Sequence, residues 1–297
     1  MLSDSFKNYL HLHFLVFVAG FTAILGELIS IGSLDLVWYR MSIAGVLMFL
    51  FVRITKKNLK VSRGTFFGFA IAGVIIALHW VTFFESIKQA NISIALSMFS
   101  SGAFFASFIE PIFFKRRVKT YEILFGLFVI CGVFLITQSE LRYLNGILLG
   151  LASAFFSTLF AVINGRFIKK HKASVISFYE FLSGVFFLSV FIVAQYRGIS
   201  ADFFNLEKTD WIYLFILASI CTTYAFIASV DVMRHISPYT VILSYNLEPV
   251  YGIILAIVLF PEKEKMSTEF YIGALIILSV VIGDAFIKQK RARRLKV

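Results

Sequence analysis

The internal order of this chain is clearest in two stretches: residues 64–88, GTFFGFAIAGVIIALHWVTFFESIK, and residues 210–234, DWIYLFILASICTTYAFIASVDVMR. Each stretch is mostly apolar and ends on an acid, two spacers and a base. The acids are Glu85 and Asp231, and every matched position is offset by 146 residues. This match indicates an internal repeat.

Composition places the whole chain in a membrane. Of its 297 residues, 59% are hydrophobic and 15% are charged, and its mean hydropathy is +0.87. A soluble domain of this size could not bury so much apolar surface. The net charge of +11 does not indicate a nucleic-acid partner, because the basic residues fall in short segments between apolar runs.

The apolar runs predict an all-α integral membrane protein with ten transmembrane helices. A hydrocarbon core of about 30 Å requires roughly 20 helical residues. By this measure the expected spans are residues 13–33, 35–53, 64–86, 91–114, 120–138, 145–165, 174–195, 210–230, 237–260 and 269–287.

The distribution of basic residues supports this count and gives an orientation. Of the 28 Lys and Arg residues, 21 fall in the segments on one side, 6 fall on the other side, and Arg40 lies within a span. Basic residues favour the cytoplasmic side of a membrane. We therefore expect both termini to be cytoplasmic.

The repeat divides the chain into two units of five spans each, residues 1–139 and 140–297. Residues 64–117 align with residues 210–263 without a gap. A unit with an odd number of spans leaves its second copy facing the opposite side of the membrane. Inverted repeats of this kind build transporters whose binding site opens alternately to each side.

Short sequence segments add a resemblance to a known family. The segments that carry it are Trp38-Tyr39-Arg40 in the second span, and Leu247-Glu248-Pro249-Val250 and Phe260-Pro261-Glu262 in the ninth. With the ten spans in two units, they make the chain similar to the EamA type of the drug/metabolite transporter superfamily. The first unit departs from the pattern, since Gly102-Ala103 stands where the second unit has Glu248-Pro249.

The resemblance implies a secondary transporter of the cytoplasmic (inner) membrane that exports small organic metabolites such as amino acids. A second interpretation keeps the transporter but makes it an exchanger of organophosphates or nucleotide sugars. That substrate would require several basic residues facing one cavity, and Arg40 is the only base within the spans. A third interpretation, from another class, is an integral membrane enzyme or a lipid-handling scaffold.

Charged residues inside the spans are candidates for the binding site, because a charge in hydrocarbon is costly. Glu27, Arg40 and His79 fall at a similar depth on three neighbouring spans. Together they could hold a zwitterionic or anionic substrate, with Arg40 binding its carboxylate. The alternative is a structural ion pair between Glu27 and Arg40, with His79 taking no part.

Glu180 and Glu248 are candidates for proton coupling. No basic residue is expected at their depth, and burial makes a carboxyl group easier to protonate. Such a group can take up and release a proton as access alternates. The alternative is a carboxyl group that faces water in a cavity and couples to nothing.

Further candidates for substrate contact are polar or aromatic. Tyr245 and Asn246 precede Pro249, which removes a backbone hydrogen bond within the ninth span. A kink at this point would expose carbonyl groups to a cavity, although a plain structural kink is the alternative. Trp80 could line an aromatic pathway, or it could pack against lipid.

The sequence carries no pattern of a catalytic or cofactor site. It has no GxxxxGK[ST] loop to hold the phosphates of ATP, and its His and Cys residues lack metal-ligand spacing. We therefore expect no enzyme activity, no metal and no cofactor. The expected partners are a small-molecule substrate and the lipid bilayer, and the fifth and tenth spans are suited to a homodimer contact.

Overall fold

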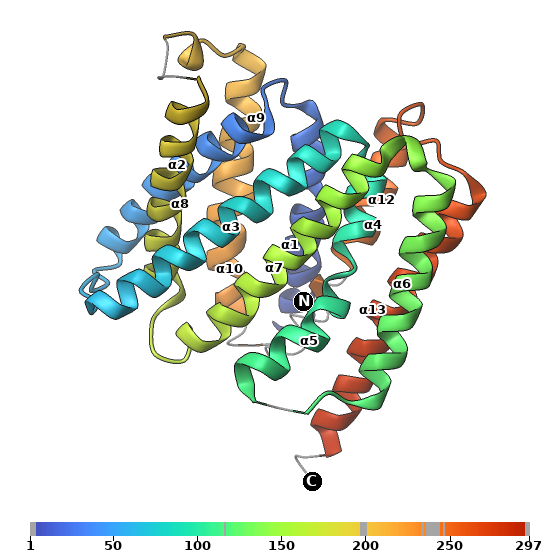
Figure 1. Cartoon of the computed structure of the whole chain (residues 1–297). Coiled ribbons are helices and arrows are strands. Elements are labelled where there is room, and N and C mark those ends of the chain that lie inside the picture. Colours follow the sequence, from blue (N-terminus) through green and yellow to red (C-terminus); the bar gives the residue numbers. More distant parts are fainter. Residues whose placement is uncertain are drawn as a thin grey trace.

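The first half of the chain forms helices that run back and forth between the two ends of a bundle (Figure 1). The computed structural model describes residues 4–115, 117–196, 201–232, 235, 244–245 and 247–294. The elements of the first half are α1 (Asp4–Leu28), α2 (Ser33–Ile54), α3 (Arg63–Gln89), α4 (Ile92–Phe99), α5 (Gly102–Phe114), α6 (Thr120–Ser139) and the 3-10 turn η1 (Leu141–Tyr143).

The second half repeats this succession. Its elements are α7 (Leu144–Phe167), α8 (Ala173–Tyr196), the 3-10 turn η2 (Ala201–Phe204), α9 (Lys208–Ala218), the π-helical segment η3 (Ser219–Tyr224), α10 (Ala225–Val232), α12 (Glu248–Leu259) and α13 (Thr268–Arg294). We call the end that carries segments 28–33, 89–92 and 260–268 the upper end. The lower end carries segments 54–63, 114–120 and 167–173 (Figure 1).

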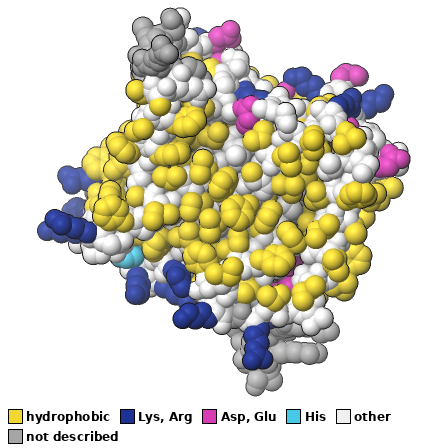
Figure 2. Space-filling view, in the orientation of Figure 1, with side chains coloured by type: hydrophobic (Ala, Val, Ile, Leu, Met, Phe, Trp, Pro, Cys, Tyr) yellow, Lys and Arg dark blue, Asp and Glu magenta, His cyan; other side chains and the backbone are white. Residues whose placement is uncertain are grey.

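Eight helical segments of the described part are long and apolar enough to cross a membrane. They correspond to the first eight expected spans. The ninth expected span, 237–260, lies partly outside the described residues, and its second half is the shorter apolar helix α12. Figure 2 shows a broad band of apolar side chains across the molecule, with most charged side chains at its margins.

The helices depart from the expected spans where polar side chains compete for backbone groups. The expected fourth span is divided into α4 and α5 at Ser100 and Ser101. The hydroxyl groups of these serines donate to the carbonyl oxygens of Leu96 at 2.8 Å and Met98 at 2.6 Å. Gly102 follows at the start of α5, and such side-chain bonds favour a turn over continuous helix.

In the second half, a helix begins at the matching position. Helix α5 begins at Gly102 and α12 begins at Glu248, 146 residues later. Pro249 therefore lies in the first turn of α12, where proline is well tolerated. The proline thus begins a helix, while much of the segment before it, where the expected kink would be judged, lies outside the described residues.

Many contacts between helices of the two halves occur twice. If a helix of the first half packs against a helix of the second, the equivalents of those two helices also pack against each other. Helix α3 packs against α7 and α8, and α1 and α2 pack against α9 and η3. Helix α1 packs against α12, and α7 packs against α4 and α5. The pairs α2–α8 and α6–α13 each join equivalent helices. This is the contact pattern expected of two similar units related by a two-fold axis.

Helices α6 and α13 lie together at one side of the bundle (Figure 1). They cross where Gly132 faces Gly273: a Cβ atom on Gly132 would lie 2.8 Å from the Gly273 carbonyl oxygen, and one on Gly273 would lie 2.7 Å from that of Gly132. Glycines allow such a close approach between helices in a membrane. Outward-facing apolar residues on this pair include Phe134, 59% exposed, and Leu275, 66% exposed.

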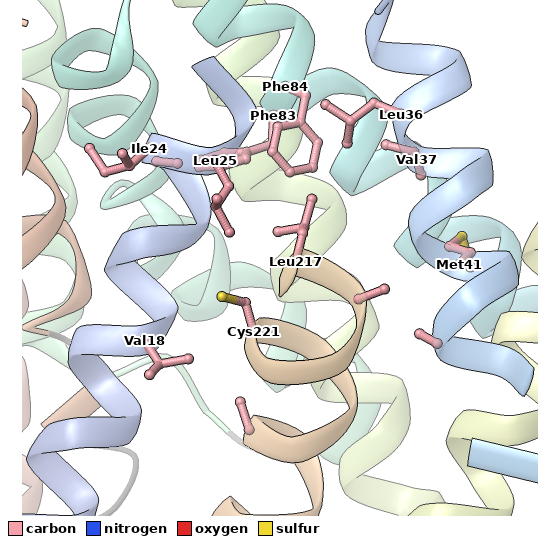
Figure 3. Packing of buried hydrophobic residues seen from close by; sticks show 14 of the residues in the cluster. Val18, Ile24, Leu25, Leu36, Val37, Met41, Phe83, Phe84, Leu217 and Cys221 are labelled. Atoms are coloured by element: carbon pink, nitrogen blue, oxygen red, sulfur yellow. The ribbon is translucent and has the colours of Figure 1, made fainter. Parts of the chain in front are cut away.

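The core that supports the central helices is apolar and closely packed. Figure 3 shows side chains of α1, α2 and α3 meeting Leu217 of α9 and Cys221 of η3. Leu25, Leu36, Phe84 and Leu217 are each at most 1% exposed. These contacts fix the height and rotation of the helices that carry the polar residues described next.

Candidate functional site

Arg40 is buried at the centre of the bundle, with 4% of its surface exposed. Its Nε atom donates a hydrogen bond to the Thr222 hydroxyl oxygen at 2.9 Å. The guanidinium carbon lies 4.0 Å from the centroid of the Trp80 ring and 5.6 Å from that of Phe84. Within the described part of the chain, Nη1 has no hydrogen-bond partner. Thr222 and Trp80 therefore hold the Arg40 side chain, while its Nη1 group remains available as a hydrogen-bond donor.

The π-helical segment η3 places Thr222 against Arg40. The hydroxyl groups of Thr222 and Thr223 donate to the carbonyl oxygens of Leu217 at 2.8 Å and Ala218 at 2.9 Å, each five residues earlier. A π segment inserts an extra residue into a helix and is common at functional sites. The wider turn presents Thr222 to α2 and holds the guanidinium group.

Glu248 lies within electrostatic range of Arg40, which the sequence did not predict. It begins α12, and Gly20 of α1 brings that helix close: a Cβ atom on Gly20 would lie 3.0 Å from the Glu248 carbonyl oxygen. The expectation that Glu248 has no base near its depth is wrong, because its helix begins at the level of Arg40. Glu248 and Tyr245 are both partly exposed.

Tyr245 is oriented by a hydrogen bond to Ser229 of helix α10. Its hydroxyl oxygen lies 2.5 Å from the Ser229 hydroxyl oxygen, and Ser229 also donates to the Ala225 carbonyl oxygen at 2.5 Å. Tyr245 is also within electrostatic range of Glu248. The structure therefore brings Arg40, Trp80, Tyr245 and Glu248 into one region. Asn246, the remaining candidate of this segment, lies outside the described residues.

His79 makes its hydrogen bonds to the second half of the chain, and it also lies within electrostatic range of Arg40. Its Nδ1 atom lies 3.0 Å from the Ser153 carbonyl oxygen and 2.9 Å from the Ser153 hydroxyl oxygen. It is 7% exposed and packs between the rings of Phe83 and Phe99. His79 thus joins α3 to α7 next to Trp80, which contacts Arg40.

Glu180 occupies a separate polar position on α8. It is 1% exposed, and it interacts with Asn164 of α7. Its Oε1 atom has no hydrogen-bond partner in the described part of the chain. The Glu180 backbone lies directly against Gly73 of α3.

Glu27 does not form the ion pair with Arg40 that was the structural alternative. Its carboxylate pairs with the Lys263 ammonium group at 2.5 Å, across the upper end of the bundle. Lys263 belongs to the turn after α12, and its carbonyl oxygen accepts a hydrogen bond from Asn91 at 3.1 Å. The base that Glu27 pairs with is therefore Lys263, in the loop at 260–268, and not Arg40 in α2.

Polar contacts at the upper end join the two halves. Asp210 accepts from the Ser30 backbone N–H at 2.8 Å and from its hydroxyl group at 2.6 Å. Glu264, 2% exposed, accepts from the backbone N–H groups of Ile92 at 3.0 Å and Ser93 at 2.9 Å. A carboxylate at the first turn of α4 satisfies donors that the helix itself leaves free. These contacts hold the two halves together at the upper end.

Sequence reasoning missed Thr222 and Ser153. Both lie in apolar stretches, and neither belongs to a recognisable motif. The adjacent Thr222-Thr223 pair was the available signal, since paired hydroxyl groups in a helix can bind earlier carbonyls. Which helix they would face depends on packing between the two halves.

Comparison with known proteins gives a consistent result. The sequence model of the EamA-like transporter family matches residues 8–138 and, a second time, residues 144–283. No curated protein matches the chain. One solved structure, described only as "Crystal structure of protein", is similar with a TM-score of 0.62 and 14% sequence identity. The similarity covers 94% of this chain and 98% of the other, and it concerns the fold alone.

Proposed function

The chain belongs to the EamA-like transporter family and is a multi-pass membrane protein, and on this premise we propose that it exports small amphoteric metabolites such as amino acids. The observation that carries the proposal is the buried guanidinium group of Arg40, which stacks on Trp80, has an Nη1 atom without a hydrogen-bond partner among the described residues, and lies within electrostatic range of Glu248. A guanidinium group with an unused donor suits a carboxylate. A carboxylate at electrostatic range suits an ammonium group.

Aromatic side chains complete the proposed site. Trp80 already stacks on the Arg40 guanidinium group and leaves part of its own surface exposed. Tyr245 contributes a hydroxyl group next to Glu248. Binding sites for small molecules combine such apolar surface with a few oriented polar groups. We include Asn246 in the site because of its place in the sequence between Tyr245 and Glu248.

The divided helices support the same location. Transporters often place their sites where helices are interrupted near the middle of the membrane, because the freed backbone groups and helix ends can bind ligands. Here α5 and α12 begin at matching positions of the two halves, and α12 packs against α4. The matching breaks favour a site between two inverted repeats, residues 1–139 and 140–297, in a ten-span protein.

Orientation and coupling are parts of the same proposal. The bias of basic residues supports cytoplasmic termini in the inner membrane, with the lower end facing the cytoplasm. The contacts that join the halves at the upper end would then make this an inward-facing arrangement. Glu180 and Glu248 are the proposed proton carriers, and Glu27 and His79 would line the route to the site. Carrying solutes in this way requires no enzyme activity.

The test is transport by the purified protein in proteoliposomes. Vesicles are offered a mixed pool of amino acids, amines, organic acids and sugar phosphates, with and without a pH gradient, and the contents are measured. We expect accumulation of amphoteric solutes, increased by the gradient. Accumulation of sugar phosphates alone would support the organophosphate exchanger instead, and no accumulation of any solute would contradict the proposal.

A further inference from the structure

A polar cavity of about 320 Å³ lies at the lower end, between two loops. One wall is the loop between α2 and α3, and the other is the loop between α7 and α8 together with the first turn of α8. The walls therefore come from different halves of the chain. The cavity is distinct from the Arg40 region and plays no part in the proposed transport site.

Basic side chains dominate this cavity. Its lining includes Lys56, Lys57, Lys60, Lys170, His171 and Lys172. Among the described residues that line it there is no Asp or Glu. Five ammonium groups gathered without a counter-ion repel one another, so a ligand that carries negative charge would relieve the repulsion.

The loops that form the walls are held in place. The Tyr179 hydroxyl group donates to the Leu59 carbonyl oxygen at 2.6 Å, joining α8 to the first loop. The Lys60 backbone N–H donates to the Asn58 side chain at 2.9 Å. The His171 ring packs edge-on against Phe69, with 5.3 Å between the ring centroids. Such fixed walls reduce the entropy that a ligand must overcome.

Apolar side chains stand directly beside the cavity along the chain. Ile54, which precedes the lining residue Thr55, is 79% exposed. Ile168, two residues before Lys170, is 49% exposed. A free phosphate makes no use of such neighbours, whereas a phospholipid can place its acyl chains on them while its headgroup enters the basic cavity.

We propose that this cavity binds the phosphate-bearing headgroup of one anionic phospholipid, with Lys57, Lys170 and Lys172 as the groups that hold it. Basic pockets between helices at a membrane surface are suited to such headgroups. Because the ligand touches both loops, its binding links the two halves of the chain at the lower end. The cavity therefore binds this lipid at one defined position. This binding is separate from the general attraction between basic loops and an anionic membrane surface.

The test measures lipid binding to the purified full-length protein in detergent by native mass spectrometry. The probes are phosphatidylglycerol, cardiolipin, zwitterionic phosphatidylcholine and soluble glycerol phosphate. The test variant is Lys57→Gln/Lys170→Gln/Lys172→Gln. The control variant, Lys115→Gln/Lys119→Gln/Lys169→Gln, removes the same charge from lysines that do not line the cavity. Lys57→Gln alone serves if the triple variant elutes as an aggregate.

For the wild-type protein we expect one saturable anionic lipid. Each removed lysine weakens binding by about fivefold, so the test variant should bind about 100-fold more weakly and Lys57→Gln about fivefold. The control variant should stay within twofold of the wild type. Equal losses in both triple variants, equal binding of phosphatidylcholine, or displacement by glycerol phosphate at the lipid's own concentration would each overturn the proposal.

Discussion

At the scale of the residue, the chain shows which part of a site can be predicted from sequence. Arg40 is identifiable because it is the only base within an apolar span. Its partners are not identifiable, because Thr222 and Glu248 approach it from helices of the other half. The alternative of a structural Glu27–Arg40 ion pair was wrong for the same reason, since equal depth on neighbouring spans does not decide which side chains meet.

The contact between Arg40 and Thr222 can be tested by a matched pair of substitutions. Thr222→Val and Thr223→Val each remove one hydroxyl group that donates to a carbonyl five residues earlier. Thr222→Val also removes the acceptor of the Arg40 Nε bond, and a bond to a charged group contributes about 1.5–3 kcal/mol. We expect a lower melting temperature for Thr222→Val than for Thr223→Val in thermal unfolding assays. Equal melting temperatures would show that the bond contributes nothing to stability.

At the scale of the element, the first eight apolar helical segments were predicted correctly from apolar length alone. The interruptions were not. Ser100 and Ser101 divide the fourth span, and the eighth contains a π segment, although both read as continuous apolar runs. Hydropathy reports whether a segment enters the membrane. It does not report how hydroxyl groups redirect backbone hydrogen bonds, which depends on the space that neighbouring helices leave.

The crossing of α3 and α8 gives a test at this scale. A Cβ atom on Gly73 would overlap the Glu180 carbonyl oxygen, whereas one on Gly64 would meet nothing within 4 Å. Both glycines belong to α3. Gly73→Ala should therefore destabilise the protein by about 1–3 kcal/mol through overpacking, while Gly64→Ala should be neutral or slightly stabilising. Thermal unfolding of both variants measures the difference, and a loss confined to Gly64→Ala would refute the assigned crossing.

At the scale of the whole molecule, the two halves are similar in sequence only at scattered positions such as Glu85 and Asp231. Their likeness is much clearer in the contacts, where pairs such as α3–α7 and α1–α9 recur with the halves exchanged. The sequence could predict the repeat because chain order is preserved within it. It could not predict the central contacts, because those depend on how the two units are placed against each other.

The proposed topology is tested by cysteine labelling. In a background with Cys131→Ala and Cys221→Ala, single cysteines replace Lys57 at the lower end and Arg142 at the upper end. We expect a membrane-impermeant maleimide added to intact cells to label the cysteine at position 142. The cysteine at position 57 should react only after the membrane is opened. Labelling of both from outside would contradict the orientation.

The measurement that bears most directly on a transport site between the two halves is exchange of a labelled amino acid in proteoliposomes by four charge variants. Arg40→Gln and Glu248→Gln alter the proposed site, while Arg53→Gln and Glu269→Gln alter exposed residues elsewhere. We predict that each of the first two lowers the exchange rate at least tenfold, since each removes a charge-assisted contact with the substrate. The other two should stay within twofold of the wild type. Unchanged exchange in Arg40→Gln and Glu248→Gln, with folding intact, would show that the buried charges serve structure alone.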